Sequence, residues 1–345
     1  MQSSDYKVMP PPIIKGKIVS VYKVRHDNGT IFTLKKIKRT IPGTNTPMEQ
    51  KYIGAGIYIM NTLTHPNVIR LRHFWLSGSN YNIIYDFFDR GSLDQEILNW
   101  NNAQNLTFPQ REMKCVFYLM QILNGFMALH TLRVMHRDFK PSNVHLKNDG
   151  SLVIAEFGIC QLGLELAGTA GKGSFAYMAP EVLPGKEAPS YSNKVDLWSI
   201  GVTFYEMVFG EPLYTITEED PAKAEKEWRE QVGTRNGETL WAPQGGIISP
   251  ECEDLIKRLL DLDSGQRISW SEVFNHGLFS LYSNHQLEVA TGFSRNKIDE
   301  VRTMFVANRE ANPGPQMVRF GLTFIDEEMD AINLAMGGGE LSIFF

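Results

Sequence analysis

One short polar segment, set between two apolar stretches, constrains this chain more than any other part of it. The segment covers residues 136–143 and reads His-Arg-Asp-Phe-Lys-Pro-Ser-Asn, so a carboxylate, an amine and an amide follow one another closely along the chain. Before it, residues 110–132 carry apolar side chains at a spacing of three to four, which is typical of a buried helix. A β-branched run at residues 152–154 follows it and favours a strand. The sequence therefore predicts a polar loop between a helix and a strand.

The bulk properties of the chain are those of an ordinary globular protein. Its 345 residues are enough to bury a large core, and a net charge of −5 gives no reason to expect a nucleic-acid partner. Its three cysteines, Cys115, Cys160 and Cys252, are far apart and odd in number, which favours a reducing compartment over a disulfide framework. No apolar signal region or membrane-length apolar run is visible. We therefore expect an intracellular protein, cytoplasmic or nuclear, with no membrane segment.

The first 90 or so residues have the pattern of a small β-rich lobe with one helix. Residues 1–12 end in three prolines and are predicted to be a flexible, extended lead-in. Asp27-Asn28-Gly29 separates two β-rich runs, which is a strong hairpin signal. Residues 48–63 have helical spacing, and residues 68–87 supply two further strands.

The rest of the chain is mainly helical in pattern, from about residue 89 onwards. Apolar periodicity predicts helices at residues 110–132, 193–209, 221–231, 251–261, 270–275 and 296–308. Residues 281–345 form a tail whose role the sequence does not indicate.

The polar segment resembles the catalytic loop of protein kinases, His-Arg-Asp-x-Lys-x-x-Asn, and the resemblance extends over residues 13–280. The lysine two residues after the aspartate resembles the pattern of the serine/threonine branch of the family. With Met135 before it, the loop looks most similar to that of NIMA-related kinases. The resemblance implies a two-lobed α+β fold. Its N-lobe (residues 13–88) would hold an antiparallel sheet and one helix, and its C-lobe (residues 89–280) would be mainly helical.

The resemblance also implies roles for the loop residues in phosphoryl transfer, a reaction that depends on positioning and charge neutralisation. Asp138 would orient the substrate hydroxyl, and Lys140 would contact the γ-phosphate. Asn143 and Glu156 would bind Mg²⁺, with Glu156 at the position of the aspartate in Asp-Phe-Gly.

ATP would bind through residues at the family's nucleotide positions. Lys35, the last residue of Phe-Thr-Leu-Lys, would bind the α- and β-phosphates. The other nucleotide-contacting positions are Gly16, Val21, Asp86, Phe88 and His145. Tyr85 would close the back of the pocket, and a histidine at position 145 is more often a packing substitution than a new ligand.

Further matches concern architecture and regulation. Glu181 would pair with Arg267, and Asp196 would anchor the backbone of the catalytic loop, because a buried charge needs a partner or hydrogen bonds. His136 and Phe157 fall, with Met60 and Leu71, at positions of the family's internal hydrophobic spine. Thr169 is placed like a phosphorylation site with Arg137 as its charge partner, and an unmodified loop threonine is an equally good interpretation.

Three departures from the family pattern leave two functions open. Glu156 replaces an aspartate, Gly56 stands where a helix glutamate would pair with Lys35, and Gly16 alone remains of three loop glycines. The nearest carboxylate along that helix, Glu49, lies seven residues earlier. One hypothesis is a serine/threonine kinase of reduced efficiency that phosphorylates a protein substrate. The other is a pseudokinase that binds protein partners without useful turnover.

Overall fold

The computed structural model divides the chain into two compact units, and each is described by itself. The described residues are 5–40, 50–103, 106–132, 134–157, 175–182, 193–218, 220–234 and 247–311. Of these, residues 5–89 together with Glu156 and Phe157 belong to the first unit, and the others belong to the second. No helix in the described ranges is both long enough and apolar enough to cross a lipid bilayer.

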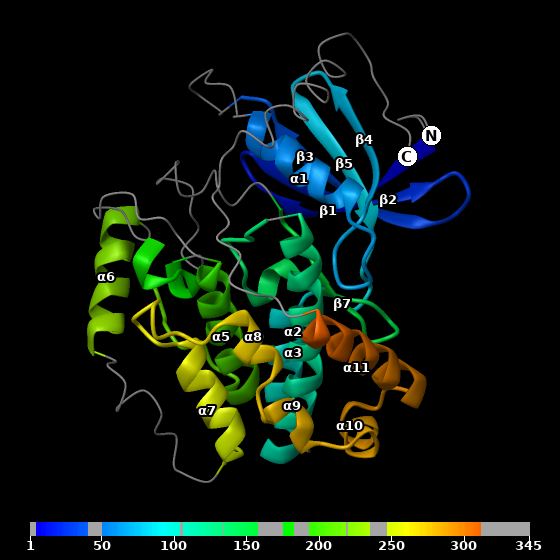
Figure 1. Cartoon of the computed structure of the whole chain (residues 1–345). Helices are drawn as coiled ribbons and strands as arrows, with labels where there is room; N and C mark the ends of the chain where they lie inside the picture. The colour runs from blue at the N-terminus through cyan, green and yellow to red at the C-terminus, as the bar shows by residue number, and fades with distance from the viewer. Residues whose placement is uncertain are drawn as a thin grey trace. The chain divides into compact units, whose positions relative to one another are not determined.

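The first unit is an antiparallel five-stranded sheet with one helix, as predicted (Figure 1). Its sheet order is β1-β2-β3-β5-β4. The elements are β1 (Tyr6–Lys15), β2 (Val19–His26), β3 (Ile31–Lys38), α1 (Gln50–Thr62), β4 (Leu71–Ser77) and β5 (Asn80–Asp86). The predicted hairpin is the β2–β3 turn, where Gly29 has φ +88°, a left-handed conformation that glycine adopts without a steric penalty.

The prediction of a flexible lead-in is wrong for the part of it that the structure describes. Residues from Tyr6 onwards form β1 and pair with β2 in register from Tyr6 opposite His26. Tyr6 is buried and its ring stacks on Trp75 of β4 at a centroid distance of 6.0 Å. The three prolines lack N–H donors, and they lie on an edge strand at the irregularity between Met9 and Ile14, where the register with β2 shifts and no ladder bond is required of them.

The second unit is mainly helical and is built around α3 (Phe108–Thr131) (Figure 1). Thr107 caps α3 in a capping box with Gln110, and most of its side chains are buried, so this is the core helix. The other helices are α2 (Leu93–Asn102), α5 (Lys194–Phe209), α6 (Pro221–Thr234), α7 (Pro250–Leu259), α8 (Trp270–Phe274), α9 (Leu278–Leu281), α10 (Asn284–Thr291) and α11 (Arg295–Glu310). Two short strands, β6 (Val144–Leu146) and β7 (Leu152–Ile154), pair antiparallel.

The predicted tail contributes helices to this core, so the second unit extends past residue 280. Ile298, Val301 and Phe305 of α11 are buried, and the Phe305 ring lies 4.9 Å from that of Phe274. The buried Asn124 of α3 donates a 3.2 Å hydrogen bond to the carbonyl of Val301. Helices α10 and α11 are therefore integral to the packing of the second unit.

Candidate active site

The polar loop that dominates the sequence is held by a buried carboxylate of α5. Asp196 is fully buried, and its two carboxylate oxygens each accept a 2.9 Å hydrogen bond, from the backbone N–H groups of His136 and Arg137. Burial raises the pKa of Asp196, while these hydrogen bonds act in the opposite direction. Arg137 has φ +66°, a strained conformation for a residue with a Cβ, and the two hydrogen bonds hold it there. The predicted anchoring role of Asp196 is consistent with this geometry.

The side chain of His136 anchors the same end of the loop a second time. Its Nε2 atom lies 2.9 Å from the carbonyl oxygen of Ala155, which joins the loop to the segment after β7. The imidazole also packs against the rings of Phe126 and Phe139, at centroid distances of 6.1 and 5.9 Å. The start of the loop is thus fixed both through its backbone and through the side chain of His136.

The three polar side chains of the loop form one cluster. The Asn143 side-chain nitrogen donates to the backbone oxygen of Asp138 at 2.8 Å and to its carboxylate at 3.0 Å. The Lys140 Nζ atom lies 3.3 Å from the same carboxylate, and the side chains of Asp138 and Lys140 are each 19% exposed. A carboxylate oriented by an amide and an ammonium group is therefore accessible at the surface of the second unit.

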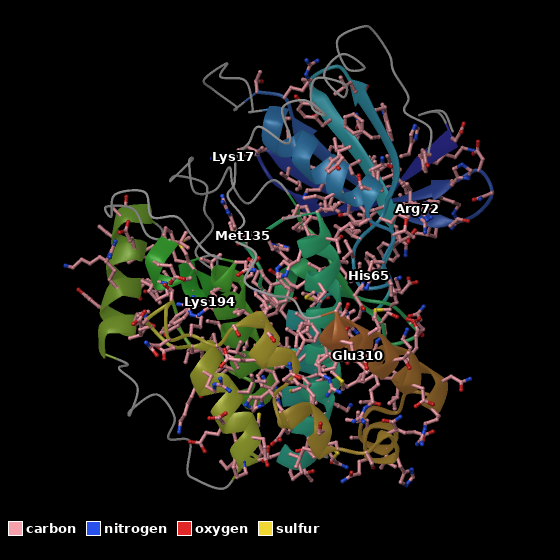
Figure 2. All side chains as sticks on the ribbon, viewed as in Figure 1. Lys17, His65, Arg72, Met135, Lys194 and Glu310 are labelled. Atoms are coloured by element: carbon pink, nitrogen blue, oxygen red, sulfur yellow. The ribbon has the colours of Figure 1, made fainter. Side chains whose placement is uncertain are left out.

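A buried ion pair lies at Glu181, which ends the segment of residues 156–181 that corresponds, by the resemblance, to the activation segment of protein kinases. Arg267 donates to the two carboxylate oxygens of Glu181 at 2.6 and 2.9 Å, and its side chain is fully buried. Lys194, labelled in Figure 2, donates to the carbonyl of Arg267. The predicted pairing of Glu181 with Arg267 is thus present. Thr169 lies outside the described residues, so its pairing with Arg137 stays a prediction.

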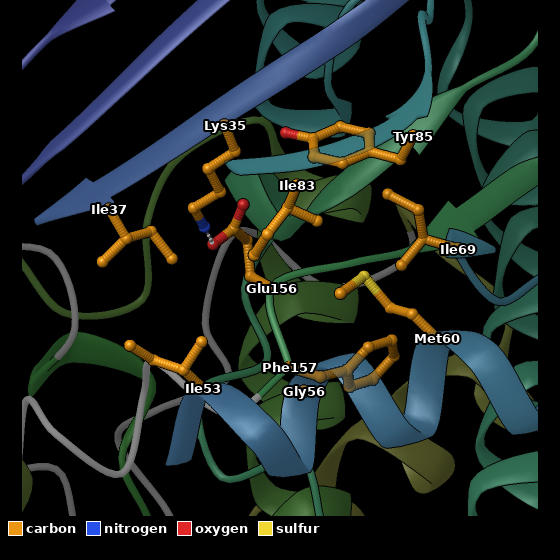
Figure 3. A pocket seen from close by; sticks show the side chains of 10 residues that line it. All are labelled: Lys35, Ile37, Ile53, Gly56, Met60, Ile69, Ile83, Tyr85, Glu156 and Phe157. Carbon is orange, nitrogen blue, oxygen red and sulfur yellow. Dashed lines mark hydrogen bonds and ion pairs between the residues drawn. The ribbon is translucent and has the colours of Figure 1, made fainter. Parts of the chain in front are cut away.

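In the first unit, Lys35 and Glu156 form an ion pair that the sequence analysis did not predict (Figure 3). Lys35 projects from β3, and its side chain is only 7% exposed, against 25% for that of Glu156. Glu156 has φ +69°. The predicted phosphate-binding lysine and the predicted metal ligand are therefore direct partners.

A pocket of about 360 Å³, counting space open to solvent, surrounds this ion pair (Figure 3). Its lining residues are Lys35, Ile37, Ile53, Gly56, Met60, Ile69, Ile83, Tyr85, Glu156 and Phe157. Gly56 faces this pocket from α1, at the position where a glutamate was missing from the sequence, and Glu49 lies outside the described residues. Tyr85 is buried, and burial together with the charge of Glu156 raises the pKa of its hydroxyl.

The remaining nucleotide positions take ordinary structural roles in their own units. Gly16 makes a tight turn between β1 and β2, where an added Cβ would lie 2.6 Å from the carbonyl oxygen of Val19. Val21 and Phe88 are buried, and the Asp86 carboxylate accepts two 2.8 Å hydrogen bonds from Arg72. In the second unit, His145 pairs with Val153 in the β6–β7 ladder.

Comparison with known proteins identifies the family. The family model described as protein kinase domain matches residues 12–279. The chain belongs to the protein kinase family. The chain is 32% identical over 241 residues to serine/threonine-protein kinase ULK3 from Xenopus laevis, covering 68% of this chain and 48% of the relative.

Two further relatives of the chain are also named as kinases. It is 31% identical over 236 residues to serine/threonine-protein kinase atg1 from Dictyostelium discoideum, covering 66% of this chain and 32% of the relative. It is 30% identical over 266 residues to Aurora kinase from Schizosaccharomyces pombe, covering 77% of this chain and 69% of the relative. The chain spans less than half the length of the first two. None of the three carries a NIMA-related name, so that subfamily stays a prediction.

Glu156 has a contact that its sequence position did not predict. It was assigned to metal binding alone, although two signals for a second contact were present. Position 56 has no carboxylate, and a carboxylate one methylene longer than usual stands at position 156. The structure brings Lys35 and Glu156 together across 121 positions of sequence.

Proposed function

We propose that this chain transfers the γ-phosphate of ATP to serine or threonine hydroxyls of a protein substrate. The observation that carries the proposal is the cluster of Asp138, Lys140 and Asn143 on a loop fixed by Asp196. A binding scaffold gives no physical reason for a carboxylate, an ammonium and an amide to be oriented together at one accessible point. Phosphoryl transfer does, because it depends on positioning and on neutralising charge.

In the proposed reaction, Asp138 accepts the proton of the substrate hydroxyl. The hydroxyl oxygen forms a bond to the γ-phosphorus, and the bond between that phosphorus and the bridging oxygen of ADP breaks. Lys140, whose Nζ atom lies 3.3 Å from the Asp138 carboxylate, stabilises negative charge on the transferred group. Asn143 holds the carboxylate in place through its side-chain nitrogen.

ATP and Mg²⁺ are used by protein kinases in general, and we propose that this chain uses both. Among the described residues, no three His, Cys, Asp or Glu side chains gather in a way that would hold a metal ion. Mg²⁺ in kinases does not require such a cage, because one or two protein oxygens and the phosphates are sufficient. Asn143 fits this role, since its nitrogen is turned toward Asp138 and its amide oxygen remains as an acceptor. Glu156 offers a carboxylate, and bound Mg²⁺ would neutralise phosphate charge.

Glu156 and Gly56 are the observations that favour the pseudokinase alternative. A glutamate places its carboxylate one methylene further from the backbone than the family's aspartate does, and Mg²⁺ has strict geometric demands. Compared with a kinase that has both the aspartate and the helix glutamate, the expected consequence for metal binding is a lower rate, because a displaced metal ligand slows transfer without abolishing it.

Binding of a non-hydrolysable ATP analogue, measured by calorimetry with and without Mg²⁺, tests the proposal. We expect binding in the presence of Mg²⁺, and a loss of affinity of about 10- to 100-fold in Lys35→Met, because a charged hydrogen-bonding group is removed. The matched control is Lys36→Met on the same strand, with affinity like that of the wild type. A chain that binds the analogue in neither condition would contradict the proposed function.

A further inference from the structure

Lys35 is a buried cation, and a buried cation needs a counter-charge. Its side chain is 7% exposed. The desolvation cost of such a group is offset only by a close opposite charge with good hydrogen-bonding geometry. In protein kinases this charge comes from the helix that follows the third strand, which is α1 in this chain.

The face of α1 that lines the pocket offers no charge to Lys35 among the described side chains. Ile53, Gly56 and Met60 line the pocket at spacings of three and four, so they share one helical face (Figure 3). Two of them are apolar and the third has no side chain. The carboxylate that reaches Lys35 comes from Glu156 instead.

The backbone at Glu156 indicates that this contact is more than incidental. Glu156 has φ +69°, and among residues other than glycine this region favours Asn, Asp and His. A glutamate there needs compensating interactions to persist. Its longer side chain supplies one, because the carboxylate reaches the Nζ atom of Lys35. The longer side chain of Glu156 therefore supplies Lys35 with the carboxylate that is missing at Gly56.

We propose that Glu156 is the positioning residue of Lys35 and stands in for the carboxylate absent from α1; its effect on catalysis rests on the proposed function. Among the described side chains, Lys35 is held by the segment that follows β7 and by none from α1. The orientation of Lys35 is therefore independent of where α1 lies, in contrast to kinases in which movement of this helix breaks the ion pair. Glu156 is then a compensating residue, and restoring the family's aspartate there makes the site worse.

A double-mutant cycle measured by thermal unfolding tests the pairing of Lys35 with Glu156 in the absence of nucleotide. Lys35→Met and Glu156→Gln should each lower the melting temperature, and the double variant should be no less stable than the worse single variant, because each change leaves the other charge unpaired. The same cycle between Lys36 and Glu156 is the control, and its effects should add. Additive effects for Lys35 and Glu156 would overturn the proposal, whether or not the chain proves to be an active kinase.

The positioning role is tested by the dependence of phosphate transfer on ATP concentration. Glu156→Asp keeps a carboxylate for the metal but shortens its reach, so the KM for ATP should rise at least about tenfold. Adding Gly56→Glu to Glu156→Asp should bring the KM back toward that of the wild type, whereas Gly56→Gln should not. A Glu156→Asp enzyme with a KM equal to or below that of the wild type would overturn the positioning role. If no variant transfers phosphate while the effects of Lys35→Met and Glu156→Gln on thermal unfolding are non-additive, the proposed function is wrong. The pairing of Lys35 with Glu156 is then still supported.

Discussion

Replacing Asp138 with asparagine should reduce phosphate transfer by about 10²- to 10⁴-fold, the range that a positioned acid–base group contributes. Asparagine has nearly the shape of aspartate and can still accept the hydrogen bond from Asn143, but it cannot take the hydroxyl proton. Initial rates of transfer from labelled ATP to a protein substrate measure the effect.

The matched control for this change is Asp299→Asn, an exposed position on α11. It should transfer phosphate at the wild-type rate, and both variants should melt within a few degrees of the wild type. Transfer that is unchanged in Asp138→Asn would mean that the activity comes from a contaminating kinase or that Asp138 is wrongly assigned.

Replacing Arg267 with methionine should lower the free energy of unfolding of the second unit by about 3–5 kcal/mol, the usual cost of removing one partner of a buried ion pair. The variant leaves the Glu181 carboxylate without its partner and also removes 3.0 Å hydrogen bonds to the carbonyls of Asp261 and Lys194. Scanning calorimetry, which resolves units that unfold separately, is the appropriate measurement.

Arg229→Met provides the comparison for the ion-pair prediction. Arg229 pairs with Glu225 one turn earlier on α6, and its side chain is 45% exposed. Exposed pairs of this kind contribute roughly 1 kcal/mol or less. An Arg267→Met variant as stable as Arg229→Met would show that the buried pair does not hold the end of the activation segment.

The parts of the site that were predictable from sequence are those fixed by short, set spacings. Asp138, Lys140 and Asn143 occupy one short loop, so a recognised motif also fixes their neighbourhood. The hairpin at Gly29 was predictable for a similar reason, because its turn chemistry is local.

The parts that were not predictable depend on packing between distant segments. The proline-rich residues before Ile13 resemble a loose lead-in, but they belong to β1, which pairs with β2 and whose Tyr6 ring stacks on Trp75. Helix α2 was missed although Leu93, Ile97 and Trp100 have the spacing of a buried helical face. The Lys35–Glu156 pair was missed because motif comparison assigns each position its family role and does not measure side-chain reach.

The contact between Lys35 and Glu156 also changes how positions 56 and 156 are interpreted. In the sequence, two departures from the family pattern at positions 56 and 156 count as two separate defects. In the structure, both positions line one pocket with Lys35. The changes at positions 56 and 156 are therefore better explained together: Glu156 replaces the helix glutamate as the partner of Lys35.

Single-turnover transfer from labelled ATP tests the central claim most directly. The purified wild-type chain is incubated with Mg²⁺, γ-labelled ATP and a protein substrate that contains serine, threonine and tyrosine, and the labelled amino acids are then identified. We expect ADP and phosphoprotein in equal amounts, with the label on serine or threonine in the wild type and no labelled protein with Asp138→Asn. A chain that binds the nucleotide but leaves all the label on ATP would contradict this expectation and show that the fold serves binding alone.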